Sequence, residues 1–169
     1  MKILLFLIVL GSLGAAHGQD LLDYKNKQYH FTLQYPSNWE KMEPHTSIFV
    51  LSERDVKEWT EKSSFDIEVN DTLKDLNQFC STYANSMRIS ENFKQFKIIS
   101  RKDTTFKNFP AIELTCTAFI PQNKKTVQWR SMFFIKGDKV FKLTLSSYPE
   151  KFATASDATK VIYESFRFQ

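Results

Sequence analysis

The chain is poor in the residue types that usually build catalytic and metal sites. Its 169 residues include only three histidines, two cysteines and four glycines. It has no G-x-S-x-G nucleophile motif, no H-E-x-x-H zinc motif and no glycine-rich phosphate loop. Neither His30 nor His45 has a His, Cys or carboxylate at metal-ligand or catalytic-triad spacing. We therefore predict a non-catalytic protein without metal or cofactor. The less favoured alternative is a hydrolase whose residues converge only in the fold.

No excess of one charge sign marks the sequence either. The 23 Lys and Arg residues and 19 Asp and Glu residues leave a formal net charge of +4, and cations and acids are interspersed along the chain. Nucleic-acid-binding proteins instead concentrate cations on one face or stripe. The charge pattern predicts a solvated surface and excludes nucleic acid from the expected partners.

Long apolar runs are also missing, apart from one near the N-terminus. Lys2 precedes the apolar run Ile3–Leu10, and small residues then lead to Ala16-His17-Gly18. This order is typical of a cleavable secretory signal, and the run is far shorter than the roughly 20 residues that a transmembrane helix needs. We predict a signal peptide over residues 1–18, cleavage near Gly18-Gln19, no transmembrane segment, and a secreted or periplasmic protein.

The two cysteines, Cys80 and Cys116, allow two interpretations. In an oxidising compartment they could form a disulfide. Alternatively, each is a small buried hydrophobic residue, because each lies on the apolar face of its own predicted element. Their spacing matches no zinc site, and the sequence leaves both interpretations open.

The remaining residues, 19–169, have the length of one domain, and 16 phenylalanines predict a core rich in rings. The clearest strand runs over Tyr29–Tyr35, where large side chains alternate with polar ones until Pro36 ends the ladder. Further stretches of short apolar or alternating sequence predict an antiparallel sheet: Ser47–Leu51, Phe65–Val69, Lys97–Ser100, Ile112–Ile120, Val127–Ile135 and Phe141–Leu145.

Two helices are predicted from apolar residues at three- and four-residue steps. The first carries one apolar face formed by Leu76, Phe79, Cys80, Tyr83 and Met87. We place its N-cap at Asp71-Thr72 and its end near Ile89 or Glu91; Asn70-Asp71-Thr72 also fits an N-glycosylation acceptor, but we favour the cap. The second helix begins near Pro149 and packs on the sheet through Ala155, Ala158, Ile162 and Phe166.

Several phrases of the sequence, together with the order of the elements, resemble a known family. They are the strand ending Tyr35-Pro36-Ser37-Asn38-Trp39, the hairpin with Phe109-Pro110-Ala111-Ile112-Glu113-Leu114, and the last helix ending at Ser165-Phe166. Over Tyr29–Phe168 the chain resembles the PsbP/Mog1 superfamily. The resemblance implies an α+β fold, an α-β-α sandwich with a central antiparallel sheet flanked by helices.

The same resemblance implies little about function. The superfamily includes an extrinsic oxygen-evolving-complex protein of chloroplasts, a Ran-binding nuclear protein and many exported bacterial proteins without a defined role. No residue set here matches a metal site of the photosynthetic members, and an export signal is incompatible with a Ran-binding role.

Two hypotheses about binding follow from the sequence. The leading one is an exported, non-catalytic bacterial domain that binds a protein partner or assists assembly at the cell envelope. Trp59, which stands among charged residues, is its candidate interface anchor, although Trp59 could equally plug a sheet edge. The alternative is a carrier of a small apolar ligand, with a cleft between the sheet and the Leu76–Met87 helix.

Overall fold

A computed structural model describes residues 20–44, 46–54, 56, 62–71 and 75–169 of the chain. The predicted signal peptide, His45, Trp59 and Thr72 lie outside these residues. Along the chain the elements are β1 (Leu21–Asn26), β2 (Phe31–Pro36), β3 (Trp39–Lys41), β4 (Phe49–Glu53), β5 (Ser64–Asp71), α1 (Leu76–Ile89), β6 (Lys94–Phe106), β7 (Phe109–Ile120), β8 (Lys125–Lys136), β9 (Lys139–Ser147), α2 (Phe152–Ser165) and β10 (Arg167–Phe168).

The strands form two antiparallel sheets. Seven strands lie in the order β3-β4-β5-β9-β8-β7-β6, and a smaller sheet has the order β1-β2-β10. The larger sheet and the two helices confirm the predicted α+β sandwich with a central antiparallel sheet. Within the described part of the chain, no helix is long and apolar enough to cross a membrane.

The strand predicted over Tyr29–Tyr35 differs from the structure in two respects. It lies in the small sheet, paired with β1 and β10, and it begins at Phe31. Tyr29 and His30 belong to the preceding hairpin turn, where His30 has a φ of 51° and the Asn26 side chain accepts a 2.9 Å hydrogen bond from the Tyr29 N–H. A tight hairpin requires such left-handed backbone, which ends the regular alternation. Phe31 and Leu33 are nevertheless fully buried, as predicted.

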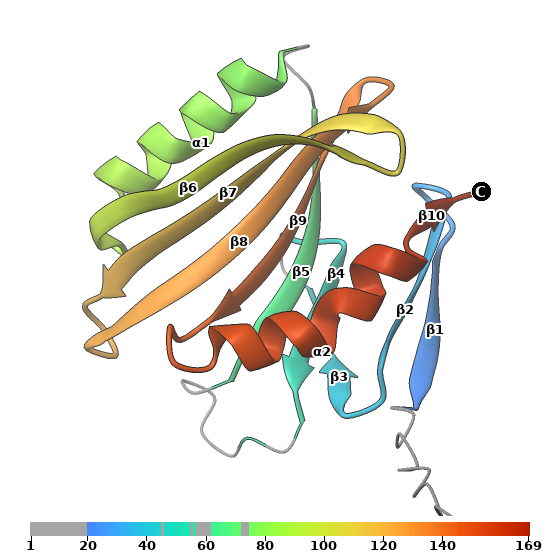
Figure 1. Cartoon of the computed structure of the whole chain (residues 1–169), viewed down its shortest axis with the longest axis horizontal. Coiled ribbons are helices and arrows are strands. Elements are labelled where there is room, and N and C mark those ends of the chain that lie inside the picture. Colours follow the sequence, from blue (N-terminus) through green and yellow to red (C-terminus); the bar gives the residue numbers. More distant parts are fainter. Residues whose placement is uncertain (1–19, 45, 55, 57–61, 72–74) are drawn as a thin grey trace, which may run out of the picture.

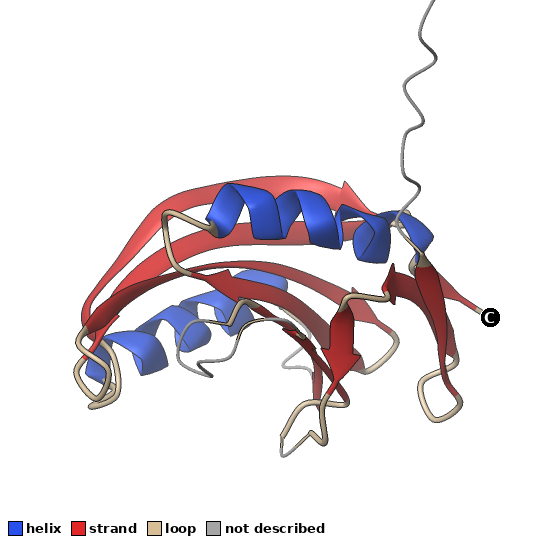
Figure 2. Cartoon of the chain, turned by 90° about the horizontal axis from the view of Figure 1, so that it is seen from below, coloured by secondary structure: helices blue, strands red, loops and turns tan. Residues whose placement is uncertain are grey.

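A helix covers each face of the large sheet (Figures 1 and 2). On one face, α2 and the small sheet pack on a core that contains Phe65 and Leu143. On the other face, α1 packs on a separate cluster that contains Ile112 and Cys116. Strand β8 contributes to both, because consecutive side chains of a strand point to opposite faces. Phe133 and Phe134 are both fully buried, so this strand is covered on both sides.

The predicted apolar stripe of α1 is confirmed, but its predicted N-cap is wrong. The N-cap is Asp75, whose carboxylate accepts hydrogen bonds from the N–H groups of Asn77 at 2.8 Å and Gln78 at 3.3 Å. Asp71 is instead the last residue of β5, where it pairs with Lys139 of β9. The strand pairing holds Asp71 in the sheet, and Asp75 supplies the capping carboxylate of the helix.

Candidate functional site

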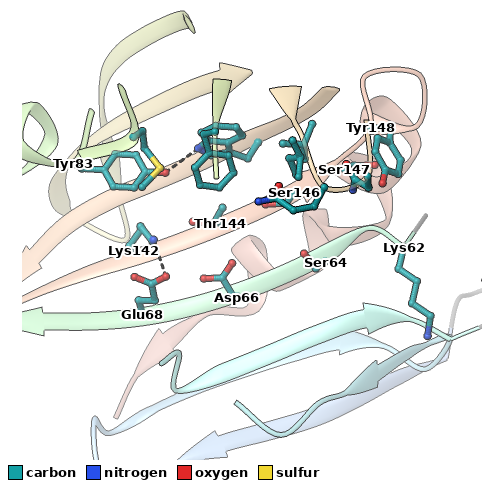
Figure 3. Close-up of a pocket in the computed structure, with 17 residues that line it drawn as sticks. Lys62, Ser64, Asp66, Glu68, Tyr83, Lys142, Thr144, Ser146, Ser147 and Tyr148 are labelled. Atoms are coloured by element: carbon teal, nitrogen blue, oxygen red, sulfur yellow. Dashed lines mark hydrogen bonds and ion pairs between the residues drawn. The ribbon is translucent and has the colours of Figure 1, made fainter. Parts of the chain in front are cut away.

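The sheet face that carries α1 is only partly covered by that helix. Helix α1 contacts β6, β7 and β8. Beside it, over β5 and β9, the face is hollowed into a cleft with a volume of about 660 Å³ (Figure 3). Its lining residues are Lys62, Ser64, Asp66, Glu68, Tyr83, Met87, Phe93, Ile120, Gln122, Asn123, Val127, Trp129, Lys142, Thr144, Ser146, Ser147 and Tyr148. The small-ligand hypothesis places its cleft between the sheet and the Leu76–Met87 helix; this cleft lies beside that helix, and Tyr83 and Met87 of α1 are in its lining.

One wall of the cleft is aromatic and firmly held. The Trp129 indole N–H on β8 donates a 2.8 Å hydrogen bond to the Tyr83 hydroxyl on α1. The ring of Phe93 lies against Trp129, with 5.6 Å between ring centroids. Burial raises the pKa of the Tyr83 hydroxyl well above its usual range, so this group stays protonated. The wall therefore offers apolar surface together with a neutral hydroxyl.

The floor of the cleft is polar and comes from two neighbouring strands. The register of β5 and β9 places Ser64 opposite Ser146, Asp66 opposite Thr144, and Glu68 opposite Lys142. The Lys142 ammonium forms a 2.7 Å ion pair with Glu68 and lies 5.1 Å from the centroid of the Tyr83 ring. Figure 3 shows Asp66 and Glu68 side by side on β5, facing Lys142 and Thr144 of β9.

Asp66 is the unusual group in this floor. Its Oδ2 atom is inaccessible to solvent and has no hydrogen-bond partner within the described residues. Burial raises the pKa of the Asp66 carboxyl from 3.8 to about 7, and Glu68 adds to that increase, while Lys142 and a hydrogen bond with Ser47 oppose it. Near neutral pH, Asp66 is therefore divided between its neutral and charged forms.

A second hollow, of about 390 Å³, adjoins the cleft along the same sheet face. The two hollows share Glu68, Tyr83 and Lys142 as lining residues, and the second continues toward Asn70 and Asp71 at the end of β5. The Glu68–Lys142 ion pair and the Tyr83 ring thus form the boundary between them.

Of the candidate site residues singled out from the sequence, none that the structure describes lines this cleft. Trp59 and His45 lie outside the described residues, and His30 lies exposed in the β1–β2 turn, away from the cleft. Cys80 and Cys116 are buried as free thiols in the cluster between α1 and the sheet. A disulfide between them in an oxidising compartment stays a prediction. Within the described ranges, no group of three or more His, Cys, Asp or Glu side chains could hold a metal ion.

Sequence reasoning missed the polar floor. Lys142, Thr144 and Ser146 alternate along β9 with core residues, so they point away from the α2 core, and all three line the cleft. A signal was present in the alternation of Asp66 and Glu68 with the buried residues Phe65 and Ile67. The same alternation is typical of an antiparallel strand with one solvated face, so it does not by itself indicate a cleft.

Comparison with known proteins gives a family and a fold. Residues 12–168 match the family described as PsbP-like protein. No curated protein sequence matches the chain significantly. The solution structure of cyanobacterial PsbP (CyanoP) from Synechocystis sp. PCC 6803 is similar with a TM-score of 0.66 and 15% identity, over 95% of this chain and 99% of that one.

Two further solved structures share the fold. LpqN, involved in cell envelope biogenesis of Mycobacterium tuberculosis, has a TM-score of 0.60 and 16% identity, over 90% of this chain and 87% of that one. The Ran-binding protein Mog1p of Saccharomyces cerevisiae has a TM-score of 0.62 and 9% identity, over 89% of this chain and 96% of that one. At these identities the likeness concerns the fold alone.

Proposed function

This chain belongs to the PsbP-like family, and on that basis we propose that it is an exported, non-catalytic binding domain that holds a small, partly apolar ligand in the cleft beside α1. The observation that carries the proposal is the cleft itself. Its volume lies in the range of small-molecule sites, and it combines an aromatic wall with a few polar groups on one side. Export is supported by the order of residues in segment 1–18.

The proposal is tested with a fluorescent apolar dye, N-phenyl-1-naphthylamine, whose emission rises when it enters an apolar site. The wild-type protein should enhance the emission saturably. Ser146→Trp, which places an indole in the cleft from β9, should abolish the enhancement, while Ser100→Trp on the exposed strand β6 should not. Circular dichroism checks that both variants fold. Equal dye binding by the two variants would remove the cleft as the binding site.

A second candidate function, binding of a protein partner, is favoured by the outer edge of the large sheet. Among the strands that the structure describes, β6 pairs with β7 alone, and it carries Lys94, Lys97, Arg101 and Lys102 against the single acid Asp103. Ile99 of β6 is 59% exposed, and Ile89 at the end of α1 is 84% exposed. A basic edge with exposed apolar side chains suits an acidic protein surface.

Site-specific photo-crosslinking separates this candidate from the first. A crosslinker at position 99 should capture an acidic protein that a crosslinker at position 154, on the exposed side of α2, does not capture. The charge reversals Lys97→Glu and Lys102→Glu should abolish the capture. Identical products at the two positions would reject β6 as an interface.

A further inference from the structure

We propose that the cleft selects ligands that carry a protonated amine on an apolar body, with the Asp66 carboxylate as their counter-ion. This inference rests on the proposed ligand-binding function and specifies its ligand class. It begins from the Asp66 Oδ2 atom, which is buried in the floor and lacks a hydrogen-bond partner in the described part of the chain. A buried carboxylate without a compensating cation is costly, and the N–H⁺ group of a ligand in the cleft that Asp66 lines would compensate its charge.

The other charges near Asp66 are already engaged. Lys142, the cation that faces it from β9, is held by Glu68 at 2.7 Å. Lys62, at the end of the cleft, forms a 2.9 Å ion pair with Glu40. Both lysines among the described residues that line the cleft are thus paired with an acid other than Asp66. A ligand cation could therefore take the place beside Asp66.

The remaining groups near Asp66 are neutral or lie across the sheet. The Ser47 side chain before β4 hydrogen-bonds to its carboxyl. Tyr163 of α2 lies on the opposite face of the sheet, where burial and, to a smaller extent, the Asp66 charge raise the pKa of its hydroxyl. The Arg130 guanidinium lies 5.5 Å from the centroid of the Tyr163 ring. None of these groups reaches into the cleft to replace a ligand cation.

The aromatic wall fits the rest of such a ligand. Trp129, Tyr83 and Phe93 present ring faces that attract both apolar groups and cations, and Lys142 already lies over the Tyr83 ring. An amine positioned at Asp66 would place its apolar substituent along this wall. A carboxylate in the same position would face two acids of the floor, Asp66 and Glu68, and would be rejected.

Because the carboxyl of Asp66 has a pKa of about 7, amine binding should depend on pH. Above pH 7 the site holds a carboxylate that attracts the amine. Below pH 7 the carboxyl is neutral and the attraction is lost, while an uncharged ligand of the same shape is unaffected.

The test compares three ligands that share one apolar chain: octylamine, octanol and octanoate. Their affinities are measured by displacement of N-phenyl-1-naphthylamine from the full protein. At pH 8 octylamine should bind about tenfold or more tightly than octanol, the increment expected of one charge-assisted hydrogen bond, and octanoate more weakly than both. At pH 5.5 the preference for the amine should fall by about tenfold.

Two isosteric variants complete the experiment. Asp66→Asn should bind octanol like the wild type and lose the preference for octylamine at pH 8. Asp103→Asn changes an equivalent charge on β6, where the side chain is 78% exposed, and should keep the preference. If the dye and octanol bind but octylamine gains nothing, the amine specificity is overturned and the ligand site stands. If neither the dye nor any of the three ligands binds, the proposed function itself fails.

Discussion

Trp129 of β8 and Tyr83 of α1 are joined by a 2.8 Å hydrogen bond from the indole N–H to the phenol oxygen, at the edge of the cleft. Tyr83 also packs its ring on Phe133, with 5.2 Å between centroids, and Trp129 is 4% exposed. This contact joins α1 to the sheet at the cleft, which both residues line.

A double-mutant cycle on this pair should reveal a coupling of about 1 kcal/mol in the free energy of unfolding. Tyr83→Phe removes the acceptor and leaves a buried indole N–H unpaired, which should cost about 1–2 kcal/mol. In the Trp129→Phe background the same change should cost little. Urea unfolding of the wild type, both single variants and the double variant measures the coupling. Fully additive costs would contradict the hydrogen bond as a stabilising contact.

The Asp66 carboxyl should make stability fall as pH rises. In the unfolded chain an Asp titrates near pH 4, whereas in the folded protein its pKa is about 7. Between these values the folded state binds a proton that the unfolded state has lost, so the free energy of unfolding decreases with rising pH and levels off above pH 7. The loss should reach about 2–4 kcal/mol for this group.

Asp66→Asn should remove that part of the pH dependence. Asn mimics the neutral carboxyl, so the variant should resemble the wild type near pH 4 and be more stable than it at pH 8. Chemical denaturation at several pH values gives the two curves, and Asp103→Asn provides a control that should run parallel to the wild type. Parallel curves for Asp66→Asn and the wild type would show that the group has an ordinary pKa.

Both helices and the strands β4 to β9 of the large sheet could be predicted because each depends on local periodicity, whereas the three-residue strand β3 of the same sheet could not. The alternation of Phe65, Ile67 and Val69 determines a strand whatever its neighbours are. The small sheet could not be predicted in the same way. Its third strand, β10, has two residues, and it pairs Phe168 with Phe31, so only the folded chain brings the partners together.

The candidate site escaped prediction for a related reason. A polar residue on one face of a strand has the same pattern whether that face meets solvent or a cleft. Helix α1 is 14 residues long and covers only part of its sheet face. The side chains of Asp66 and Lys142 lie beside the helix on this face, where they form the floor of the cleft. The extent of that cover is a tertiary property that no local pattern encodes.

The two cysteines should be unreactive in the folded protein. Both thiols are buried, and burial raises the pKa of each to about 11, so the reactive thiolate is scarce at pH 8. Ellman's reagent should therefore detect fewer than about 0.2 thiols per native chain within minutes. In denaturant without reductant, we expect two thiols per chain. A value of zero in denaturant would instead establish the Cys80–Cys116 disulfide that the sequence allows.

The two members of the Glu68–Lys142 ion pair should shift the titration of Asp66 in opposite directions. Lys142 lowers the pKa of the Asp66 carboxyl and Glu68 raises it. Lys142→Met should therefore raise that pKa, because the cation that opposes the increase is gone and Glu68 is left unpaired beside Asp66. Glu68→Gln should lower it, because Lys142 is then released to compensate Asp66 alone. Carbon-13 NMR of the side-chain carboxyls follows each titration directly. The absence of a shift in both variants would mean that the charges of Glu68 and Lys142 do not act on the Asp66 carboxyl.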